Sequence, residues 1–305
     1  MNVKFFLAEI ISLILILAGS AFAESSLINH SYSNVAYASI STSQVCNIYC
    51  PSSNKKKLPV IILVHGGGFA MGSQNDPIIQ PVIEKALANG YIVVSVDYRK
   101  SSEAVFPAAL ADVKAAVRWV KANAGKYKFD DSSITIWGES AGAYLSTMTA
   151  LTPEVISLNG DVKENLEYSS SVNNLVSFYA PIEFFTMDAD FEELGLPECA
   201  NHNKENSFES AFLGQALNQD KEKTYKTYWE TYSDSVRKTN LKRAWIQAGS
   251  NDKNVPYVQS KNLAERLNKV ARNTKIHYSI IDGAGHMDSA FYSDENISDI
   301  FEFIK

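Results

Sequence analysis

The chain has 305 residues, of which 46% are hydrophobic and 20% are charged. This length fits one large α/β domain with an insertion better than two independent domains, and the composition allows a sizeable core. The formal net charge of -6 argues against a nucleic acid or an anionic membrane as partner, because binding phosphates requires concentrated positive charge. The only basic run, residues 55–57, follows Pro-Ser-Ser-Asn, so we expect a solvated hairpin loop there.

The N-terminal residues are typical of a secretion signal. They contain a positive charge, an apolar stretch and a small-x-small cleavage site, namely Lys4, residues 10–17 and Ala21-Phe22-Ala23. A membrane-spanning helix needs about 20 apolar residues, and Glu9 interrupts this stretch. We therefore expect residues 1–23 to be a signal peptide, cleaved near Ala23. Residues 24–305 would then be a single secreted or periplasmic domain without a membrane anchor.

Export permits disulfides, but only three cysteines are present: Cys46, Cys50 and Cys199. Cys46 and Cys50 fall in what looks like one strand. Four residues at about 3.3 Å each separate them by roughly 13 Å, which is beyond disulfide reach. Either one remains a possible partner for Cys199. Because no metal-ligand spacing accompanies the cysteines, we favour buried thiols and expect no metal site.

Strand and helix patterns alternate along the rest of the chain. Short apolar, β-branched runs predict strands at residues 59–64, 91–96, 133–137, 175–179, 244–248 and 276–281. Helical spacing predicts helices over residues 78–89, 107–124 and 141–151, and Val255-Pro256 opens another. Gly90 would end the first of these and Gly125 the second. This alternation indicates a mostly parallel, doubly wound sheet with helices on both faces.

One stretch breaks the alternation. Residues 181–240 contain no clear strand and are too long for an ordinary connection. They carry many aromatic rings: Phe184, Phe185, Phe191, Phe208, Phe212, Tyr225, Tyr228, Trp229 and Tyr232. Most of these rings are expected only to fasten the insertion to the body. The functional alternative is a cap over the site, with a few rings lining an acyl or alcohol pocket.

Residues 138–142, Gly-Glu-Ser-Ala-Gly, have the spacing of a nucleophile turn. The pattern alone is weak, but a strand ends just before it and a helix begins near Ala141, so the chain must turn sharply. Glycine at positions 138 and 142 relieves crowding against the neighbouring backbone. The Ser140 hydroxyl is then exposed at the carboxyl edge of the sheet. Ser140 is the candidate nucleophile; the alternative is a glycine-rich turn with an idle serine.

A second motif, His65-Gly66-Gly67-Gly68-Phe69, follows the first strong strand. Three glycines lose backbone entropy that a plain turn would not require, and they permit close backbone approach to a ligand. Their N–H groups, with that of Ala141 at the helix start, would hold the negative oxygen of a tetrahedral intermediate. We expect His65 to fix this loop rather than to take part in the chemistry.

The base must be one of five histidines: His30, His65, His202, His277 and His286. Only His286 lies in a loop just past a terminal strand, where Gly283 and Gly285 let the loop reach back to the serine. We therefore assign His286 as the candidate general base.

The acid that orients the histidine should follow another strand, between serine and histidine in sequence. Asp252 fits both place and order. Asp282 is its main competitor, although only four residues before His286 it fits a strand end better. Asp234 lies in the insertion and is favoured less.

Together these motifs resemble the hormone-sensitive-lipase-like and bacterial acetyl/feruloyl esterase branch of the α/β-hydrolases. The resemblance covers nearly all of the mature chain and rests on His65-Gly66-Gly67-Gly68-Phe69, Asp97-Tyr98-Arg99, Gly138-Glu139-Ser140-Ala141-Gly142, Asp252 with Val255-Pro256, and Gly283-Ala284-Gly285-His286. It implies the α/β-hydrolase fold and oxyanion donors at Gly67, Gly68 and Ala141. His65, Gly66, Gly138, Glu139 and Gly142 would support the motifs. It also implies short-chain carboxylic esters as substrates, with acetylated or feruloylated plant polysaccharides for an exported member.

The resulting hypothesis is ester hydrolysis in two steps through an acyl-enzyme, without a metal or organic cofactor. Its partner is a small-molecule or polysaccharide-linked ester. One alternative is a serine peptidase or amidase of the same fold, against which the lack of a propeller-sized segment argues. The other is a catalytically inactive binding protein, although such proteins commonly lose a triad residue. The sequence leaves acyl chain length and oligomeric state open.

Overall fold

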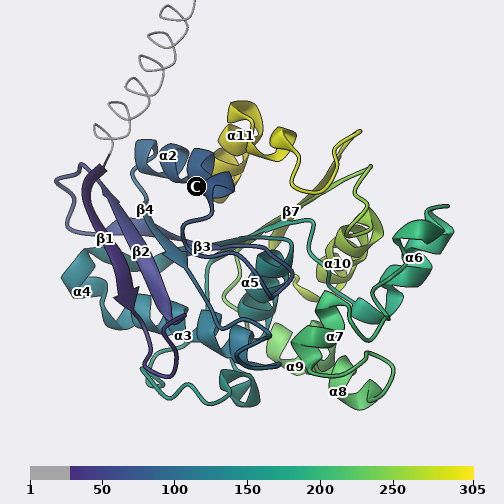
Figure 1. Cartoon of the computed structure of the whole chain (residues 1–305). Helices are drawn as coiled ribbons and strands as arrows, with labels where there is room; N and C mark the ends of the chain where they lie inside the picture. Colours follow the sequence, from purple (N-terminus) through teal and green to yellow (C-terminus); the bar gives the residue numbers. More distant parts are fainter. Residues whose placement is uncertain (1–27) are drawn as a thin grey trace, which may run out of the picture.

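The structure is a computed structural model and describes residues 28–305, so the expected signal peptide lies outside the described residues. The described strands form one eight-stranded sheet in the order β1-β2-β4-β3-β5-β6-β7-β8 (Figure 1). The pairs β1–β2 and β2–β4 are antiparallel, and all other neighbours are parallel. The bounds are β1 (Ile28–Ala36), β2 (Val45–Pro51), β3 (Leu58–Val64), β4 (Ile92–Val96), β5 (Phe129–Glu139), β6 (Asn174–Phe178), β7 (Arg243–Gly249) and β8 (Lys275–Ile281).

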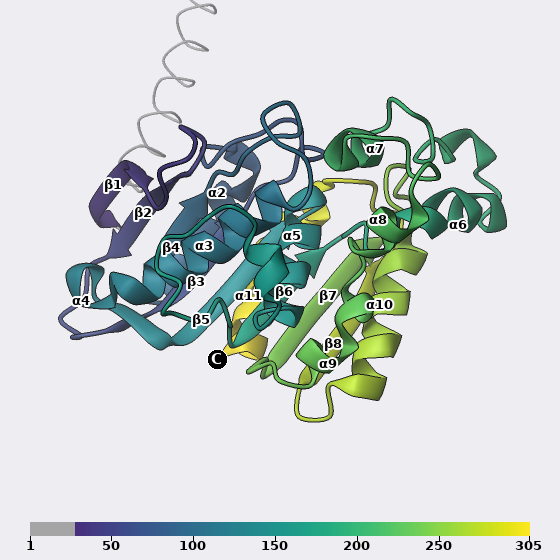
Figure 2. The ribbon, with the colours of Figure 1, turned by 90° about the horizontal axis from the view of Figure 1, so that it is seen from below.

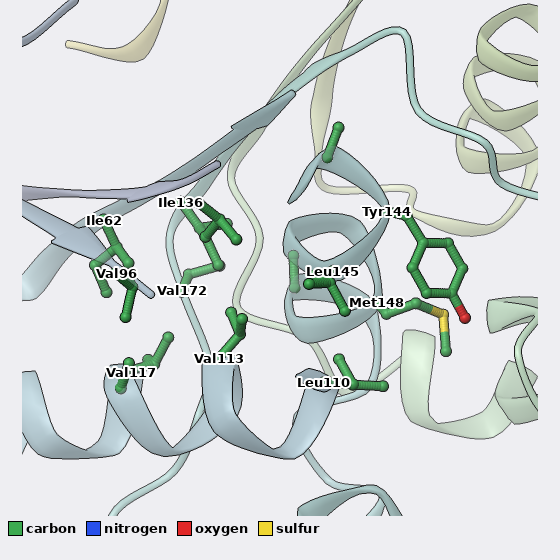
Figure 3. Packing of buried hydrophobic residues seen from close by; sticks show 14 of the residues in the cluster. Ile62, Val96, Leu110, Val113, Val117, Ile136, Tyr144, Leu145, Met148 and Val172 are labelled. Atoms are coloured by element: carbon green, nitrogen blue, oxygen red, sulfur yellow. The ribbon is translucent and has the colours of Figure 1, made fainter. Parts of the chain in front are cut away.

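Helices cover both faces of this sheet. One face packs on α2 (Gln80–Ala88) and α11 (Asp294–Ile304), and the other on α3 (Ala108–Ala122), α5 (Ala141–Leu151) and α10 (Tyr257–Val270). Side chains of a strand alternate between faces, so Ile61 of β3 joins the first core and Ile62 the second. Figure 3 shows Ile62 above α3, on the side where that helix presents Val113 and Val117. The predicted mostly parallel, doubly wound sheet is therefore confirmed.

Short helices fill the connections. Between β6 and β7, where no strand was expected, the structure has none, and the chain forms short helical turns instead. These are η3 (Phe184–Thr186), α6 (Met187–Glu193), η4 (Pro197–Cys199), α7 (Phe208–Leu213), α8 (Lys221–Tyr225), η5 (Trp229–Tyr232) and α9 (Ser233–Val236). Elsewhere the short helices are η1 (Pro77–Ile79), α4 (Ala124–Tyr127), η2 (Ile156–Asn159) and η6 (Ser289–Tyr292). In Figure 2, α6 and α7 lie beyond one end of β7 and α9 lies near its other end.

The prediction that Gly125 ends the second helix is wrong. Helix α3 ends at Ala122, and Gly125 lies inside the short α4. The break falls at Asn123, whose side-chain amide donates to the carbonyl of Trp119 at 2.9 Å. An asparagine side chain that bonds to a nearby backbone carbonyl in this way competes with helix continuation.

All three cysteines are free thiols, as the residue spacing favoured for Cys46 and Cys50. Both lie in β2, Cys46 is buried, and Cys199 is buried in the insertion. Burial raises the pKa of the Cys46 thiol to about 12, so this thiol remains protonated at neutral pH. Across residues 28–305, no helix has the length and apolar character needed to span a membrane.

A buried ion pair fastens the loop that follows β4 to helix α3. The Arg99 guanidinium donates to Asp112 at 2.8 Å, and the Asp112 side chain has no exposure to solvent. Gln44 also donates to this carboxylate, at 2.6 Å. On its outer side Arg99 pairs with Asp161, which is largely exposed.

Replacing Arg99 with methionine should lower the free energy of unfolding by about 3–5 kcal/mol, because the Asp112 carboxylate would remain buried without its cation. Urea denaturation monitored by circular dichroism measures the loss. The matched control is Lys57→Met, which breaks an exposed pair with Asp131 and should leave the midpoint almost unchanged. Equal midpoints for the two variants would contradict this account of Arg99.

Candidate active site

Ser140 lies in a sharp turn at the carboxyl end of β5. Its backbone has φ 51° and ψ -123°, and α5 begins at the next residue. A positive φ is costly for a residue with a side chain, and such strain persists only where the surroundings impose it. Here the N–H of Ser140 donates to the carbonyl of Phe178 at 3.0 Å, which holds the turn against β6.

The glycines around Ser140 are required by close packing of backbone. A Cβ on Gly138 would lie 2.2 Å from the carbonyl oxygen of Gly142. A Cβ on Gly142 would lie 2.1 Å from the carbonyl oxygen of Val64, at the end of β3. This is the relief of crowding that the spacing of the two glycines predicts.

Three loops bring Ser140, His286 and Asp252 into one hydrogen-bonded line. His286 Nε2 lies 3.0 Å from Ser140 Oγ, and His286 Nδ1 lies 2.7 Å from Asp252 Oδ2. The other oxygen of Asp252, Oδ1, accepts from the backbone N–H groups of Asn254 and Val255 at 2.8 and 2.9 Å. The Asp252 side chain is fully buried, so its orientation is fixed by these bonds.

The competing acids lie elsewhere. Asp282 lies directly after β8 and accepts from Ser250 Oγ at 3.1 Å. Asp234 is in α9, which precedes β7 and so lies at the amino edge of the sheet. Among the described residues neither has a hydrogen bond to His286.

The other histidines have separate partners. His277 stacks on Trp245 with ring centroids 3.7 Å apart, and His202 contacts Glu209 at 3.0 Å within the insertion. His30 lies in the edge strand β1.

His65 is buried beneath the glycine loop. Its Nδ1 lies 2.7 Å from the carbonyl of Gly66, its Nε2 lies 3.0 Å from Asp97 Oδ1, and its ring stacks on Tyr98. Burial alone would raise the pKa of Asp97, but hydrogen bonds with His65 and Lys100 lower it below its usual value. Asp97 therefore remains a carboxylate that anchors the histidine, and the histidine anchors the loop.

The loop itself runs through left-handed backbone at Gly67 (φ 105°) and Gly68 (φ 59°). A Cβ on Gly67 would lie 2.4 Å from the carbonyl of Met71, so no other residue fits there. The N–H groups of Gly67 and Gly68 donate to no other group in the described part of the chain. The N–H of Ala141, the first residue of α5, likewise has no acceptor within its helix. All three residues line the same cavity as Ser140.

Behind the site lies a buried cluster that sequence reasoning missed. Glu139 is 3% exposed and accepts from the hydroxyls of Tyr179, at 3.2 Å, and of Tyr292. Burial raises the pKa of Glu139. The ring of Tyr179 packs against His286 with centroids 4.6 Å apart. No motif marks Tyr179, the last residue of a predicted strand, or Tyr292, which lies in η6.

A cavity of about 540 Å³ opens over Ser140 and His286. Its second wall comes from the insertion, through residues 201–209, together with Lys253 and Asn254. Phe208 is the insertion's one aromatic side chain in the described lining, and it is half exposed. Phe184, Phe191, Phe212 and Trp229 are buried instead. Most of the insertion's rings thus fasten it to the body, as expected, while one faces the cavity.

In residues 28–305 no group of three or more His, Cys, Asp or Glu side chains could hold a metal ion.

A model of the BD-FAE family matches residues 46–267. The chain belongs to this family. The predicted resemblance to the α/β-hydrolase esterases is thereby confirmed.

Proteins similar to this chain in sequence or structure carry esterase names, in line with this family. Esterase LipC of Mycobacterium tuberculosis is 30% identical over 237 residues, which are 76% of this chain and 53% of LipC. The chain therefore spans about half the length of that relative. A carbohydrate esterase from gut microbiota, solved in truncated form, superposes with a TM-score of 0.80 at 25% identity, covering 92% of this chain and 96% of its own. A bifunctional GH43-CE protein of Bacteroides eggerthii gives 0.76 at 27% identity, covering 90% and 35%.

Proposed function

We propose that this protein is an exported serine carboxylesterase that hydrolyses short-chain carboxylic esters. The observation that carries the proposal is the continuous line from Asp252 through His286 to Ser140, with separations of 2.7 and 3.0 Å. Such a line makes a serine hydroxyl nucleophilic near neutral pH. The names of the similar proteins, esterase and carbohydrate esterase, support the same reaction class.

In the first step His286 Nε2 accepts the hydroxyl proton while Ser140 Oγ attacks the ester carbonyl carbon. The tetrahedral intermediate collapses when His286 gives that proton to the leaving alcohol, and an acyl-enzyme remains on Ser140. Water then attacks by the same route and releases the carboxylic acid. Asp252 keeps Nδ1 as the donor nitrogen of His286, so that Nε2 can accept, and stabilises the imidazolium that forms.

The negative oxygen of the intermediate would be held by the N–H groups of Gly67, Gly68 and Ala141. These groups lack other acceptors and surround Ser140 from two directions, the glycine loop and the start of α5. Removing one such donor typically lowers the rate by about 10²–10³-fold. Gly66, Gly138 and Gly142 support this geometry because they allow backbone segments to pack closely. His65 supports the glycine loop, and Glu139 supports the turn that carries Ser140.

We propose acetyl or feruloyl esters of plant polysaccharides as the natural substrates. The lining combines apolar side chains such as Phe208 and Met71 with several hydrogen-bonding ones from residues 201–207. A ring facing the cavity suits an aromatic acyl group, and the polar wall suits a sugar. Cleavage of a signal peptide near Ala23 would deliver the enzyme to such extracellular polymers.

The test uses the mature chain, residues 24–305, on p-nitrophenyl acetate, butyrate and octanoate, methyl ferulate, acetylated xylan and a p-nitroanilide. We expect acetate and butyrate to exceed octanoate, and a fluorophosphonate probe to label Ser140. Faster turnover of the anilide than of any ester would favour a peptidase. Absence of both labelling and turnover in folded protein would favour an inactive binding protein.

Phe208 offers a test of the insertion's part in specificity. Phe208→Ala should raise KM for methyl ferulate about tenfold, because the acyl ring loses an aromatic contact, and should leave kcat for p-nitrophenyl acetate near the wild-type value. The matched control is Tyr225→Ala, since Tyr225 is equally exposed in the insertion but does not line the cavity. Equal KM values for the two variants would remove Phe208 from the acyl site.

A further inference from the structure

A second hollow, of about 490 Å³, lies at the opposite edge of the sheet from Ser140. It is lined by residues that precede β7 and by residues between α10 and β8. Because β5, β7 and β8 are parallel, their amino ends share one edge and their carboxyl ends the other. The seven residues of β7 span six steps of about 3.3 Å, which separates the two edges by roughly 20 Å. Figure 2 shows α9 near this end of β7, away from α6 and α7.

The two segments around the hollow are strongly basic. Residues 236–243 and 269–276 contain seven Lys or Arg and no Asp or Glu, although the whole chain has a net charge of -6. Arg243 and Lys275, the first residues of their strands, lie directly opposite each other in the β7–β8 register. We call this surface the basic edge and define it by Arg237, Lys238, Lys242, Lys269, Arg272 and Lys275.

None of these cations has a carboxylate partner within the described residues. No ion pair and no side-chain hydrogen bond involves any of them, and the charged group of Lys275 lies over the ring of Phe303. Lys269 interacts electrostatically with Glu230, but the ion pair of Glu230 is with Arg266, at 3.5 Å. Like charges gathered without counter-charges repel one another in the free protein, and a bound polyanion would relieve that repulsion.

The lining also indicates which kind of anion fits. Thr239 and Asn273 offer hydrogen-bonding groups beside the cations, which suits sugar hydroxyls. The described lining has no aromatic ring, so the stacking platform that commonly serves a neutral sugar is lacking. Its one exposed large apolar side chain is Val270, which is little for insertion into a lipid surface.

We propose that the basic edge is a second binding site, which takes the carboxylate groups of an acidic polysaccharide. This inference rests on the proposed function, since it supposes a polymer that carries the esters. The polymer would be held at the amino edge of the sheet while its ester groups are hydrolysed at the carboxyl edge. The overall charge of -6 argues against polyanions as partners, but it averages over a surface on which cations are concentrated at one place.

The test measures binding of polygalacturonate and of neutral arabinoxylan to the full mature chain carrying Ser140→Ala, by titration calorimetry. We expect polygalacturonate to bind, arabinoxylan not to bind, and affinity to fall at least tenfold between about 20 mM and about 300 mM salt. Adding Arg237→Ser and Arg272→Ser should weaken binding about tenfold. The matched control adds Lys55→Ser and Lys56→Ser, which remove the same charge from the β2–β3 connection, and should leave affinity unchanged.

Equal affinity for the two polysaccharides, or equal weakening by both variant pairs, would overturn the proposal. So would tight binding to phosphatidylglycerol vesicles through Arg237 and Arg272 without any binding of polygalacturonate, which would assign the surface to a membrane. Because the binding protein lacks the nucleophile, these results do not depend on ester hydrolysis. The ester panel does not depend on the basic edge, so the two proposals fail separately.

Discussion

Ser140→Ala should reduce kcat for p-nitrophenyl acetate by at least about 10⁴-fold while the protein still folds. The hydroxyl is the atom that would form the acyl-enzyme, and no other described hydroxyl lies within hydrogen-bonding distance of His286 Nε2. Alanine fits the turn sterically, because the Cβ is retained. Steady-state hydrolysis measures the loss of kcat, and a thermal melt shows whether the variant folds.

The control for Ser140→Ala is Ser146→Ala, in the helix α5 that follows Ser140. Ser146 is fully buried, its hydroxyl has no hydrogen-bond partner, and it does not line the cavity. Its loss should leave kcat unchanged. If Ser140→Ala retained more than about a tenth of wild-type kcat in carefully purified protein, a different nucleophile would have to be sought.

Asp252→Asn should lower kcat by about 10³–10⁴-fold, and the structure gives the reason in detail. Oδ1 accepts from two backbone N–H groups, those of Asn254 and Val255. An asparagine would keep its oxygen there and turn its NH₂ group toward His286 Nδ1. The histidine would then accept at Nδ1 and carry its proton on Nε2, where it can no longer accept the proton of Ser140.

Asp282→Asn is the matched control, because it makes the same change at the competing acid. The Asp282 carboxylate bonds to Ser250 and not to the histidine, so kcat should stay within about twofold of wild type. A large loss in Asp282→Asn, with little loss in Asp252→Asn, would reverse the assignment of the orienting acid. The pH profile gives a second readout, since a misoriented histidine changes the pH dependence of kcat.

The core of the fold could be predicted because its signals are local. The buried strands β3 and β4 are continuous apolar runs, and the two glycines around Ser140 reflect contacts within one turn. The order and direction of the strands then made it possible to predict which loops meet at Ser140. Once the strands are parallel, the residues that follow β7 and β8 must reach the same edge as Ser140, which is why Asp252 and His286 could be singled out from a single sequence.

What was missed depends on contacts between distant segments or on weak patterns. Strand β1 is an exposed edge strand with mostly polar residues, so no apolar alternation marks it. Tyr179 and Tyr292 meet over Glu139 only after the chain has folded, and nothing in their neighbourhoods indicates the meeting. The basic edge likewise combines two segments separated by most of β7 and α10. Each half alone is an ordinary surface stretch.

The two walls of the cavity come from different parts of the chain, which bears on how the specificity of such an enzyme could change. The proposed catalytic residues lie on turns that follow strands of the sheet, whereas residues 201–209 belong to a segment that contributes no strand to it. Changes in that stretch alter the shape and polarity presented to a substrate without touching the backbone packing at Gly138 and Gly142. If the proposed function holds, substitutions among these nine residues would be expected to change which esters are accepted while the proposed catalytic residues stay in place.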